Sequence, residues 1–380
     1  MNDPGTGLLI ESQAALERFF GELAGEPLLA VDTEAASFHR YHDRIYLLQV
    51  SSRSETRVID PLAVSDLAPL GRALADPEVE IVFHDADYDL RLLDQQYGFR
   101  TTRLFDTRVA AQLLNEPAVG LAALLEKYLG VRLDKRLQRA DWSARPLTEA
   151  MIRYAAADTR YLPALRDLLR DRLVARGRLE WAEEEFGLLE QVRWAPDDGG
   201  EPGYLRIKGA RLLSGRELAV LRELYQWREE TAARTDRAAF RILGNEPMLE
   251  IARAQPTELA ALRAIRGVGT ELVERRGREL LAAVRGALEL PETALPRLER
   301  PARRPADPEY EARLDRLKAA RNRLAQEFDL APGVLCPNST LEAIARAVPT
   351  TVDELRRIPG IRRWQVEAFG PALLAALPPG

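Results

Sequence analysis

An internal repeat in the C-terminal half of the chain is the feature that most constrains the fold. IARAQPTELAALRAIRGV begins at Ile251 and IARAVPTTVDELRRIPGI begins at Ile344, so the two segments align without a gap at an offset of 93 residues. The match continues to Gly277 against Gly370. A period of this length is too long for one unit of a solenoid. The repeat therefore predicts two copies of a small helical domain.

Two breaks rich in Pro, Gly and charged residues divide the chain. WAPDDGGEPG lies at 194–203, and PETALPRLERPARRPADP lies at 291–308. We expect an N-terminal domain over 1–195, helical domains over 207–290 and 309–380, and a semi-rigid Pro-rich linker over 291–308. The two helical domains are either inert spacers or accessory domains that bind a partner. A duplicated small domain that follows a separate α/β domain favours the binding role.

The N-terminal domain alternates strand and helix signals over its first 110 residues. Short runs rich in Val and Ile predict strands at LLAVDT, RIYLLQVSS, TRVID and EIVFHD. The first three strands have short links and are expected to form an antiparallel meander. Helices are predicted at SDLAPLGRALAD and DYDLRLLDQQYG, then almost continuously from 106 to 190, at FDTRVAAQLL, GLAALLEKYLG and TEAMIRYAAADTRYLPALRDLLRDRL. This pattern predicts an α/β domain with a mixed sheet and flanking helices.

Composition excludes several classes of protein. The single cysteine, Cys336, rules out an intramolecular disulfide and indicates a reducing, cytoplasmic location. We identify neither a signal peptide nor an apolar run long enough to span a membrane, so no membrane partner is expected. The formal net charge is −5, so a nucleic-acid partner needs a local basic surface. Residues 207–291 carry 15 Lys and Arg against 12 Asp and Glu, a surplus that permits RNA contact.

Two carboxylates follow one another on one face of the first predicted strand. Asp32 and Glu34 are two residues apart, so their side chains point the same way, about 6–7 Å apart. Like charges at this separation repel, and the sheet gains nothing from them. One interpretation is a strand end that frays into solvent. The other is a site that needs two carboxylates together.

Two further segments contain residue types that support such a site. FHDADYDL places Asp85, Asp87 and Asp89 where a strand ends and a helix begins, and a helix N-terminus uses only one or two acidic residues as caps. RYAAADTRYL places Tyr154 and Asp158 four residues apart on one helix face. The three alanines between them allow the helix to pack closely on a sheet. The alternative for this pair is a core-edge Tyr beside an exposed Asp.

Together the three segments supply four carboxylates and one tyrosine, a set suited to divalent cations. Oxygen ligands without Cys or His favour Mg²⁺ or Mn²⁺. Two such ions about 4 Å apart can stabilise the attacking and leaving oxygens of a phosphoryl displacement. The hydroxyl of Tyr154 could then orient the attacking water.

Other candidate sites are weaker. The histidines His39, His42 and His84 have no Cys partners at zinc spacing, so a zinc site is not expected. GVG at 267–269 and PGI at 359–361 are either phosphate-contacting turns or tight turns between helices. GVGT lacks the P-loop lysine and follows no strand, which argues against nucleotide binding.

A basic patch lies before DWSARPL. Lys135, Arg136 and Arg139 either bind substrate phosphate or pair with nearby acidic residues, and we favour substrate.

DTE, HDADYD and YAAAD, in this order and spacing, resemble the three exonuclease motifs of the DEDD superfamily. The tyrosine four residues before the last Asp is typical of its DEDDy branch. LFDTRVAAQLL and LQRADWSARPLTEAMIRYAAADTRYLPAL resemble the ribonuclease D family, and the two C-terminal modules resemble HRDC domains. The resemblance covers nearly the whole chain. It implies a ribonuclease H-like α/β catalytic domain followed by two small all-α HRDC-like domains.

The resemblance also assigns roles to residues. It implies Asp32, Glu34, Asp89 and Asp158 as ligands of two divalent cations, Mg²⁺ or Mn²⁺, and Tyr154 as the residue that orients water. The family pattern of His followed five residues later by Asp selects Asp89 and leaves Asp85 and Asp87 as bystanders.

The chain departs from its relatives beside the second ligand. Many relatives have a bulky apolar residue directly after the glutamate, where this chain has Ala35 and Ala36. We expect Phe38 to act as the wedge against the terminal base.

The implied activity is metal-dependent 3′→5′ hydrolysis of RNA. It would release nucleoside 5′-monophosphates and trim precursors such as those of tRNA. We expect a monomer, because we identify no dimer motif in the sequence. A DNA exonuclease is the first alternative, because sugar choice depends on contacts with the 2′-OH. A nucleic-acid-binding scaffold with an inert nuclease fold is the second, and the complete set of carboxylates argues against it.

Overall fold

The computed structural model describes residues 7–134, 136–196, 200–298 and 307–378. It contains two compact units. The first unit comprises residues 1–35, 45–194 and 304–380, and the second comprises residues 36–44 and 195–303. Part of the predicted linker, 299–306, lies outside the described residues.

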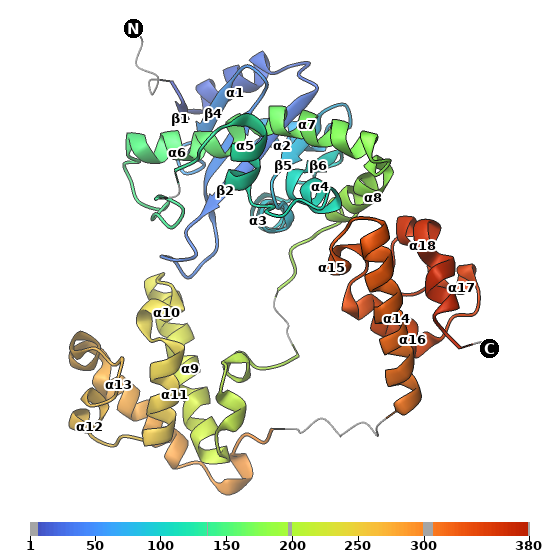
Figure 1. Cartoon of the computed structure of the whole chain (residues 1–380). Coiled ribbons are helices and arrows are strands. Elements are labelled where there is room, and N and C mark those ends of the chain that lie inside the picture. The colour runs from blue at the N-terminus through green and yellow to red at the C-terminus, as the bar shows by residue number, and fades with distance from the viewer. Residues whose placement is uncertain (1–6, 135, 197–199, 299–306, 379–380) are drawn as a thin grey trace. The chain divides into compact units, whose positions relative to one another are not determined.

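A six-stranded mixed sheet forms the centre of the α/β domain in the first unit (Figure 1). Its order is β1-β4-β3-β2-β5-β6. The strands are β1 (Leu9–Ile10), β2 (Leu28–Ala35), β3 (Ile45–Ser51), β4 (Thr56–Ile59), β5 (Glu80–Phe83) and β6 (Leu104–Asp106). β2, β3 and β4 pair antiparallel, which confirms the predicted meander, whereas β2 pairs with β5 and β5 with β6 in parallel.

Two strands were not predicted. β1 has two residues and pairs in parallel with β4. β6 takes Phe105 and Asp106 from the segment predicted to be helical, because these residues pair with Val82 and Phe83 of β5. The helix of that segment begins only at Thr107, where the carboxylate of Asp106 accepts hydrogen bonds from the first free backbone amides.

Helices pack against the central strands of this sheet. α6 packs on β2, β3 and β4, and α7 packs on β2 and β5. The predicted helix through TEAMIRYAAADTRYLPAL is divided at Tyr161 into α6 and α7. The helices of the α/β domain are α1 (Gln13–Glu22), α2 (Ala68–Ala75), α3 (Asp87–Tyr97), α4 (Thr107–Leu113), α5 (Leu121–Leu129), α6 (Glu149–Arg160), α7 (Leu162–Ala175) and α8 (Leu179–Leu189).

The two copies of the repeat fold as small helical domains, as predicted. The second repeat domain belongs to the first unit and comprises α14 (Pro308–Glu327), α15 (Pro332–Leu335), α16 (Asn338–Ala347), α17 (Val352–Arg356) and α18 (Arg363–Ala375). Its buried residues belong to the same hydrophobic cluster as those of the α/β domain.

The first repeat domain has its own hydrophobic cluster in the second unit. It comprises α9 (Gly215–Thr235), α10 (Ala239–Ile242), α11 (Asn245–Ala254), α12 (Leu259–Arg263) and α13 (Thr270–Leu288). The short 3₁₀ helices η1 (Gly203–Arg206) and η2 (Ala210–Leu212) precede it, and η3 (Glu292–Ala294) follows it. From residue 195 onward the described residues contain no strand.

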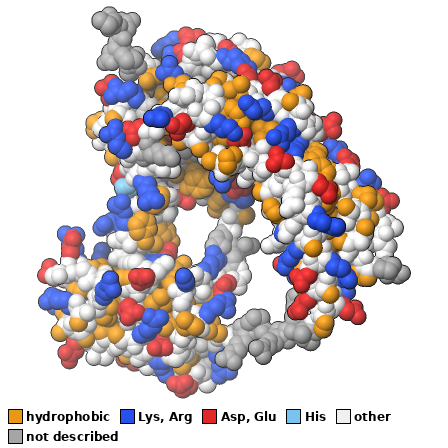
Figure 2. Space-filling model, in the orientation of Figure 1, with side chains coloured by type: hydrophobic (Ala, Val, Ile, Leu, Met, Phe, Trp, Pro, Cys, Tyr) orange, Lys and Arg blue, Asp and Glu red, His pale blue; other side chains and the backbone are white. Residues whose placement is uncertain are grey.

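Charged side chains of both signs alternate over the visible surface (Figure 2). This distribution matches the small net charge, so any nucleic-acid contact depends on local groups of basic residues. Among the described residues, no helix is both long and apolar enough to cross a bilayer.

Candidate active site

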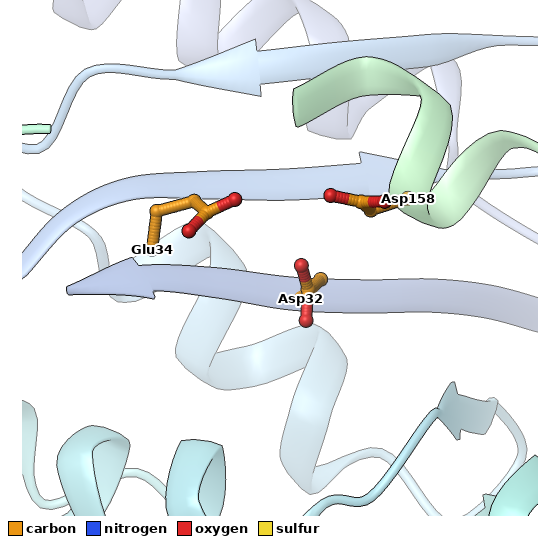
Figure 3. Close-up of side chains that lie close together, drawn as sticks. All are labelled: Asp32, Glu34 and Asp158. Atoms are coloured by element: carbon orange, nitrogen blue, oxygen red, sulfur yellow. The ribbon is translucent and has the colours of Figure 1, made fainter. Parts of the chain in front are cut away.

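Three carboxylates come together where β2 meets α6 (Figure 3). Asp32 and Glu34 project from β2, and Asp158 projects from α6. One oxygen of each lies within 4.8 Å of the others. These distances allow the three side chains to ligate one cation or two neighbouring cations. Spacing within β2 predicted the first pair, and the helix places the third against it.

Small side chains bring α6 close to the sheet. The hydroxyl of Thr148 accepts a hydrogen bond from the amide of Met151 and so fixes where the helix begins. Ala155 and Ala156 are buried against the strands, and Tyr154 and Asp158 are half-buried on the same face. A larger residue in place of either alanine would move the carboxylate of Asp158 away from β2.

The fourth carboxylate, Asp89, is bonded to the backbone and side chain of β2. It lies in the first turn of α3 and is 7% exposed. Its Oδ1 accepts hydrogen bonds from the Thr33 hydroxyl and from the Thr33 amide, the latter at 3.2 Å. Thr33 lies between Asp32 and Glu34 in the strand. Asp89 thus lies next to the cluster of three carboxylates, but its Oδ1 accepts hydrogen bonds from Thr33.

A buried carboxylate positions the start of α3. Asp106, at the end of β6, accepts hydrogen bonds from the amides of Asp85, Ala86, Arg108 and Val109. Asp85 has a positive φ of 69°, a conformation that costs an L-residue free energy and is held here by these bonds. The turn therefore determines where Asp89 emerges. Sequence reasoning missed Asp106 because it was placed within a predicted helix.

The other two acidic residues of this segment face solvent and basic partners. Asp87 forms an ion pair with Arg91 at 2.7 Å, and Asp85 forms one with Arg108 at 2.5 Å. Asp89 differs from both, because it is buried and its charge contributes to the raised pKa of Glu34. This arrangement favours Asp89 over its two neighbours as the site residue.

Desolvation and mutual repulsion raise the pKa values of the clustered carboxyls. Burial and then the nearby Asp158 raise the pKa of Asp32 to about 8, and burial raises the pKa of Asp158 to about 7. Burial, followed by charge repulsion, also raises the pKa of Glu34 and of Asp89 well above the usual range. The site therefore favours a positive charge that would relieve this repulsion.

Tyr154 lies beside these carboxyls and remains protonated. Burial, then the charges of Asp158 and Glu34, raise the pKa of its hydroxyl. The ring packs against Trp142, with centroids 5.9 Å apart. Arg145 donates from Nη1 to the backbone carbonyl of Trp142 at 2.8 Å, and its Nε and Nη2 donate to the buried carboxylate of Asp60 at 2.7 and 2.9 Å. A protonated hydroxyl in this position can donate a hydrogen bond or orient a water.

Polar groups without protein partners lie close to the same strands. Gln49 of β3 pairs in register with Asp32, is fully buried, and neither its Oε1 nor its Nε2 has a partner among the described residues. The Nε1 of Trp142 is likewise without one there. Buried orphan groups of this kind indicate water or an ion that completes the site. With the all-oxygen donor set, they fit a hydrated divalent cation.

A cavity of about 620 Å³ borders the tyrosine and the last aspartate. Its lining includes Tyr154, Asp158, Arg153, Tyr161 and Arg136. This volume is within the range of small-ligand sites and would accept a terminal nucleotide. Its lining combines apolar side chains such as Val131 and Leu133 with basic ones such as Arg132 and Arg153.

The predicted substrate-binding residues differ in where they lie relative to this cavity. Arg136 lines the cavity but forms an ion pair with Asp134 at 2.6 Å, so both interpretations of the basic patch apply to it. Arg139 does not line the cavity, and Lys135 lies outside the described residues. Phe38 belongs to the second unit, where its ring centroid lies 6.4 Å from that of Phe240. The wedge role of Phe38 stays a prediction.

Comparison with known families agrees with the fold and the site. A model of the 3′-5′ exonuclease family matches residues 9–174, and a model of the HRDC domain matches residues 217–284 and 311–377. Fold and site thus define a 3′-5′ exonuclease joined to two HRDC domains. The similarity extends further, to individual proteins over nearly their full length. The chain belongs to the ribonuclease D family and is a 3′-5′ exoribonuclease.

Relatives and solved structures support this assignment. Ribonuclease D of Gluconacetobacter diazotrophicus is 36% identical over 97% of this chain and 92% of its own length. Ribonuclease D of Escherichia coli is 34% identical over 76% of each sequence. The crystal structure of the Escherichia coli enzyme, described as an exoribonuclease involved in structured RNA processing, matches with a TM-score of 0.69, 29% identity and 97% coverage of each chain. A Bifidobacterium adolescentis protein matches with a TM-score of 0.83, 27% identity and coverage of 97% and 96%. The predicted resemblance is confirmed.

Proposed function

We propose that this exoribonuclease uses two divalent cations, Mg²⁺ or Mn²⁺, held by Asp32, Glu34, Asp89 and Asp158. The observation that carries the proposal is the cluster of three carboxylates from β2 and α6, with ligand oxygens within 4.8 Å. Asp89 would complete the set from α3 by turning from Thr33 toward the cluster. When bound, the cations activate water and stabilise negative charge at the reacting phosphate.

The residues of the chain itself position the substrate and the water. The cavity beside Tyr154 receives the 3′-terminal nucleotide, and the hydroxyl of Tyr154 holds the attacking water by a hydrogen bond. Arg136 exchanges its solvent-exposed partner Asp134 for a substrate phosphate, because a surface ion pair is weak and a guanidinium binds phosphate through two bonds. Water attacks the phosphorus of the last phosphodiester, and the bond from this phosphorus to the 3′ oxygen of the preceding nucleotide breaks. The terminal nucleotide leaves as a nucleoside 5′-monophosphate.

The substrate we propose is structured RNA with a 3′ extension, in particular a tRNA precursor. Support comes from the description of the Escherichia coli relative, which processes structured RNA. We also propose a monomer, because the three clustered carboxylates and Asp89 of α3 all belong to one chain, so the site needs no second copy. Buried Cys336 is a free thiol and is compatible with the reducing cytoplasm.

The test uses a 5′-labelled tRNA precursor with a 3′ extension, incubated with Mg²⁺, Mn²⁺ or EDTA. We expect stepwise shortening from the 3′ end in either metal and none in EDTA. Asp158→Asn removes one ligand oxygen and should abolish shortening. Light scattering of the same sample gives the number of chains in the particle.

The controls separate the parts of the proposal. A DNA strand of matched sequence tests sugar choice, and a precursor without the extension tests where trimming stops. Shortening that persists in EDTA would exclude the metal mechanism. Degradation of every RNA at the same rate would exclude a preference for tRNA precursors.

A further inference from the structure

The two repeat domains can be compared residue by residue. At the offset of 93, three of their helices begin and end at equivalent positions: α10 with α15, α11 with α16, and α12 with α17. The same internal bond recurs, from Arg228 to Asn245 at 2.7 Å and from Arg321 to Asn338 at 2.6 Å. The two copies therefore share these helices, and their equivalent surface positions can be compared directly.

In the second repeat domain, one face is docked on α8 of the α/β domain. The indole of Trp364 stacks on that of Trp181, with centroids 4.5 Å apart and planes inclined by 17°. Phe328 packs against Trp181 at 5.8 Å and against Phe369 at 6.0 Å. Aromatic side chains thus supply the apolar part of this interface.

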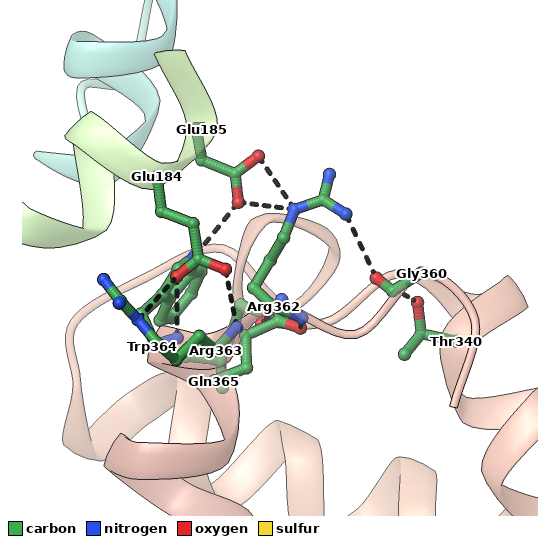
Figure 4. A network of polar contacts seen from close by, with 9 residues as sticks. Glu184, Glu185, Thr340, Gly360, Arg362, Arg363, Trp364 and Gln365 are labelled. Atoms are coloured by element: carbon green, nitrogen blue, oxygen red, sulfur yellow. Dashed lines mark hydrogen bonds and ion pairs between the residues drawn. The ribbon is translucent and has the colours of Figure 1, made fainter. Parts of the chain in front are cut away.

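Two glutamates of α8 supply its polar part (Figure 4). Glu184 accepts hydrogen bonds from the amides of Arg363 and Trp364 at 2.6 and 2.9 Å, so it caps the N-terminus of α18. Glu185 accepts from Nε of Arg362 and from the indole N–H of Trp364, at 2.9 and 3.0 Å. An anionic group therefore already occupies the start of α18.

The equivalent face of the first repeat domain has a different chemistry. Thr235, Glu271 and Arg276 replace the three aromatic residues Phe328, Trp364 and Phe369. Arg237 and Arg241 replace Leu330 and Val334. The face that is apolar and docked in one copy is polar and basic in the other.

These residues enclose a cavity of about 200 Å³, here called the arginine cavity. It is lined by Thr231, Thr235, Arg237, Arg241, Ile242, Glu271, Leu272, Arg275 and Arg276. Four arginines face one glutamate, so the local charge is positive although the chain as a whole is acidic.

Two of the four arginines are available to a ligand. Arg275 forms an ion pair with Glu271 at 3.1 Å, and Arg276 forms one with Glu279 at 2.9 Å. Within the described part of the chain, Arg237 and Arg241 have no acidic partner.

The neighbouring acidic group is already engaged. The carboxylate of Asp236 accepts hydrogen bonds from the amides of Tyr41 and His42, both at 3.2 Å, and lies 3.8 Å from Arg40. The first turn of α13, at the rim of the cavity, has no side-chain cap at Gly269. All of these groups belong to the second unit.

We propose that the arginine cavity binds a phosphodiester of the RNA substrate, upstream of the nucleotide being removed. Guanidinium groups bind phosphate through paired hydrogen bonds, and the cavity has room for one such group. The inference rests on the proposed action on RNA. It also gives the two copies different roles. The first repeat domain binds RNA, whereas the equivalent face of the second packs against α8 and has no such site.

The test compares two double variants of the full-length protein. Arg237→Ala with Arg241→Ala empties the cavity of its two unpaired arginines. Arg253→Ala with Arg285→Ala removes the same charge from exposed positions that do not line it. Binding of a fluorescent RNA is followed by anisotropy in EDTA, so cleavage plays no part. Thermal unfolding checks that both variants are folded.

We expect the cavity variant to bind RNA roughly tenfold more weakly at low salt, and the slope of log affinity against log salt to fall by about 0.7 for one phosphate contact on a single strand. The control variant should bind like the wild type.

Two results would overturn the proposal: equal RNA affinity in the wild type and the cavity variant, or equal weakening in both variants, which would reflect net charge alone. Failure of the proposed function is distinct from either. In that case the wild type would leave the extended tRNA precursor untrimmed, whatever its affinity.

Discussion

At the scale of single residues, the carboxylates of the site repel one another in the absence of a cation. A carboxyl whose pKa is raised by folding ionises more readily in the unfolded chain, so its contribution to stability is lost as the pH rises through the folded value. For Asp32 and Asp158 these values are about 8 and 7. The pKa of His84, lowered to about 4 by burial, affects only lower pH.

The metal-free protein should therefore lose stability between pH 7 and 9. In EDTA we expect the unfolding temperature to fall by about 5 °C over this range. With Mn²⁺ the fall should disappear, because binding of the cation to the ionised carboxylates stabilises the folded state. Differential scanning calorimetry measures both curves. A metal-free curve that rises from pH 7 to 9 would contradict the proposed environment of these carboxyls.

Asp89 and Asp85 form a matched pair that tests which aspartate of the second segment belongs to the site. Asp89→Asn keeps the shape of the side chain and removes a charge beside Asp32, and we expect kcat to fall by about 100-fold or more. Asp85→Asn removes an exposed charge paired with Arg108 and should change kcat by less than about twofold. Single-turnover rates on RNA give the comparison. A larger effect at Asp85 would reverse the assignment.

Tyr154 tests the positioning of water separately from metal binding. Tyr154→Phe removes only the hydroxyl and leaves the ring against Trp142. We expect kcat to fall roughly 100-fold, with KM unchanged. Calorimetric titration with Mn²⁺ should give the same affinity as the wild type. A loss of metal affinity in this variant would mean that the hydroxyl holds the cation and does not orient the water.

Sequence spacing predicted which residue types share a face, but not which atoms bond. Asp32 and Glu34 had to point the same way, and Tyr154 and Asp158 had to share a helix face. The bond from Thr33 to Asp89 could not be foreseen, since it depends on how α3 approaches β2 in three dimensions. Gln49 was missed for the same reason, because its neighbour Asp32 is distant in sequence.

At the scale of secondary structure, α8 joins the α/β domain to the second repeat domain. The carboxylate of Glu184 satisfies two amides that no residue of α18 satisfies. Glu184→Ala should lower the free energy of unfolding by about 2 kcal/mol, because both amides lose a charged acceptor. Glu183→Ala, at an exposed position of the same helix, is the control and should have little effect. Urea denaturation measures the free energy of unfolding of both variants. An equal loss of stability in the two would show that the cap formed by Glu184 does not stabilise the protein.

Strands and helices were predictable in proportion to their length. β2 to β5 each have four or more residues and contain β-branched or aromatic side chains, so they could be recognised in the sequence. β1 and β6 have two and three residues, too few to show any period. They exist because longer strands offer them free edges, which is a property of the assembled sheet.

At the scale of the whole molecule, the α/β domain and the second repeat domain share one hydrophobic cluster. Deleting residues 307–380 should expose Trp181 and the adjacent apolar surface of α8. We expect the truncated protein to bind a hydrophobic dye and to aggregate at concentrations where the intact chain is stable. Dye fluorescence and light scattering measure this. A truncated protein that stays dispersed and binds no dye would show that the cluster is separable.

The equivalence of the two repeat domains has a consequence for how mutations in them will be tolerated. The bond from arginine to asparagine recurs in both copies, so a change there should be harmful in either. Phe328 and Thr235 occupy equivalent positions in the repeat but have different surroundings. Phe328 packs against Trp181 of α8, whereas Thr235 lines the arginine cavity. A saturation scan of the gene should therefore give two profiles that coincide at scaffold positions and diverge at this face. If the two repeat domains were aligned and their profiles averaged, this difference between them would be lost.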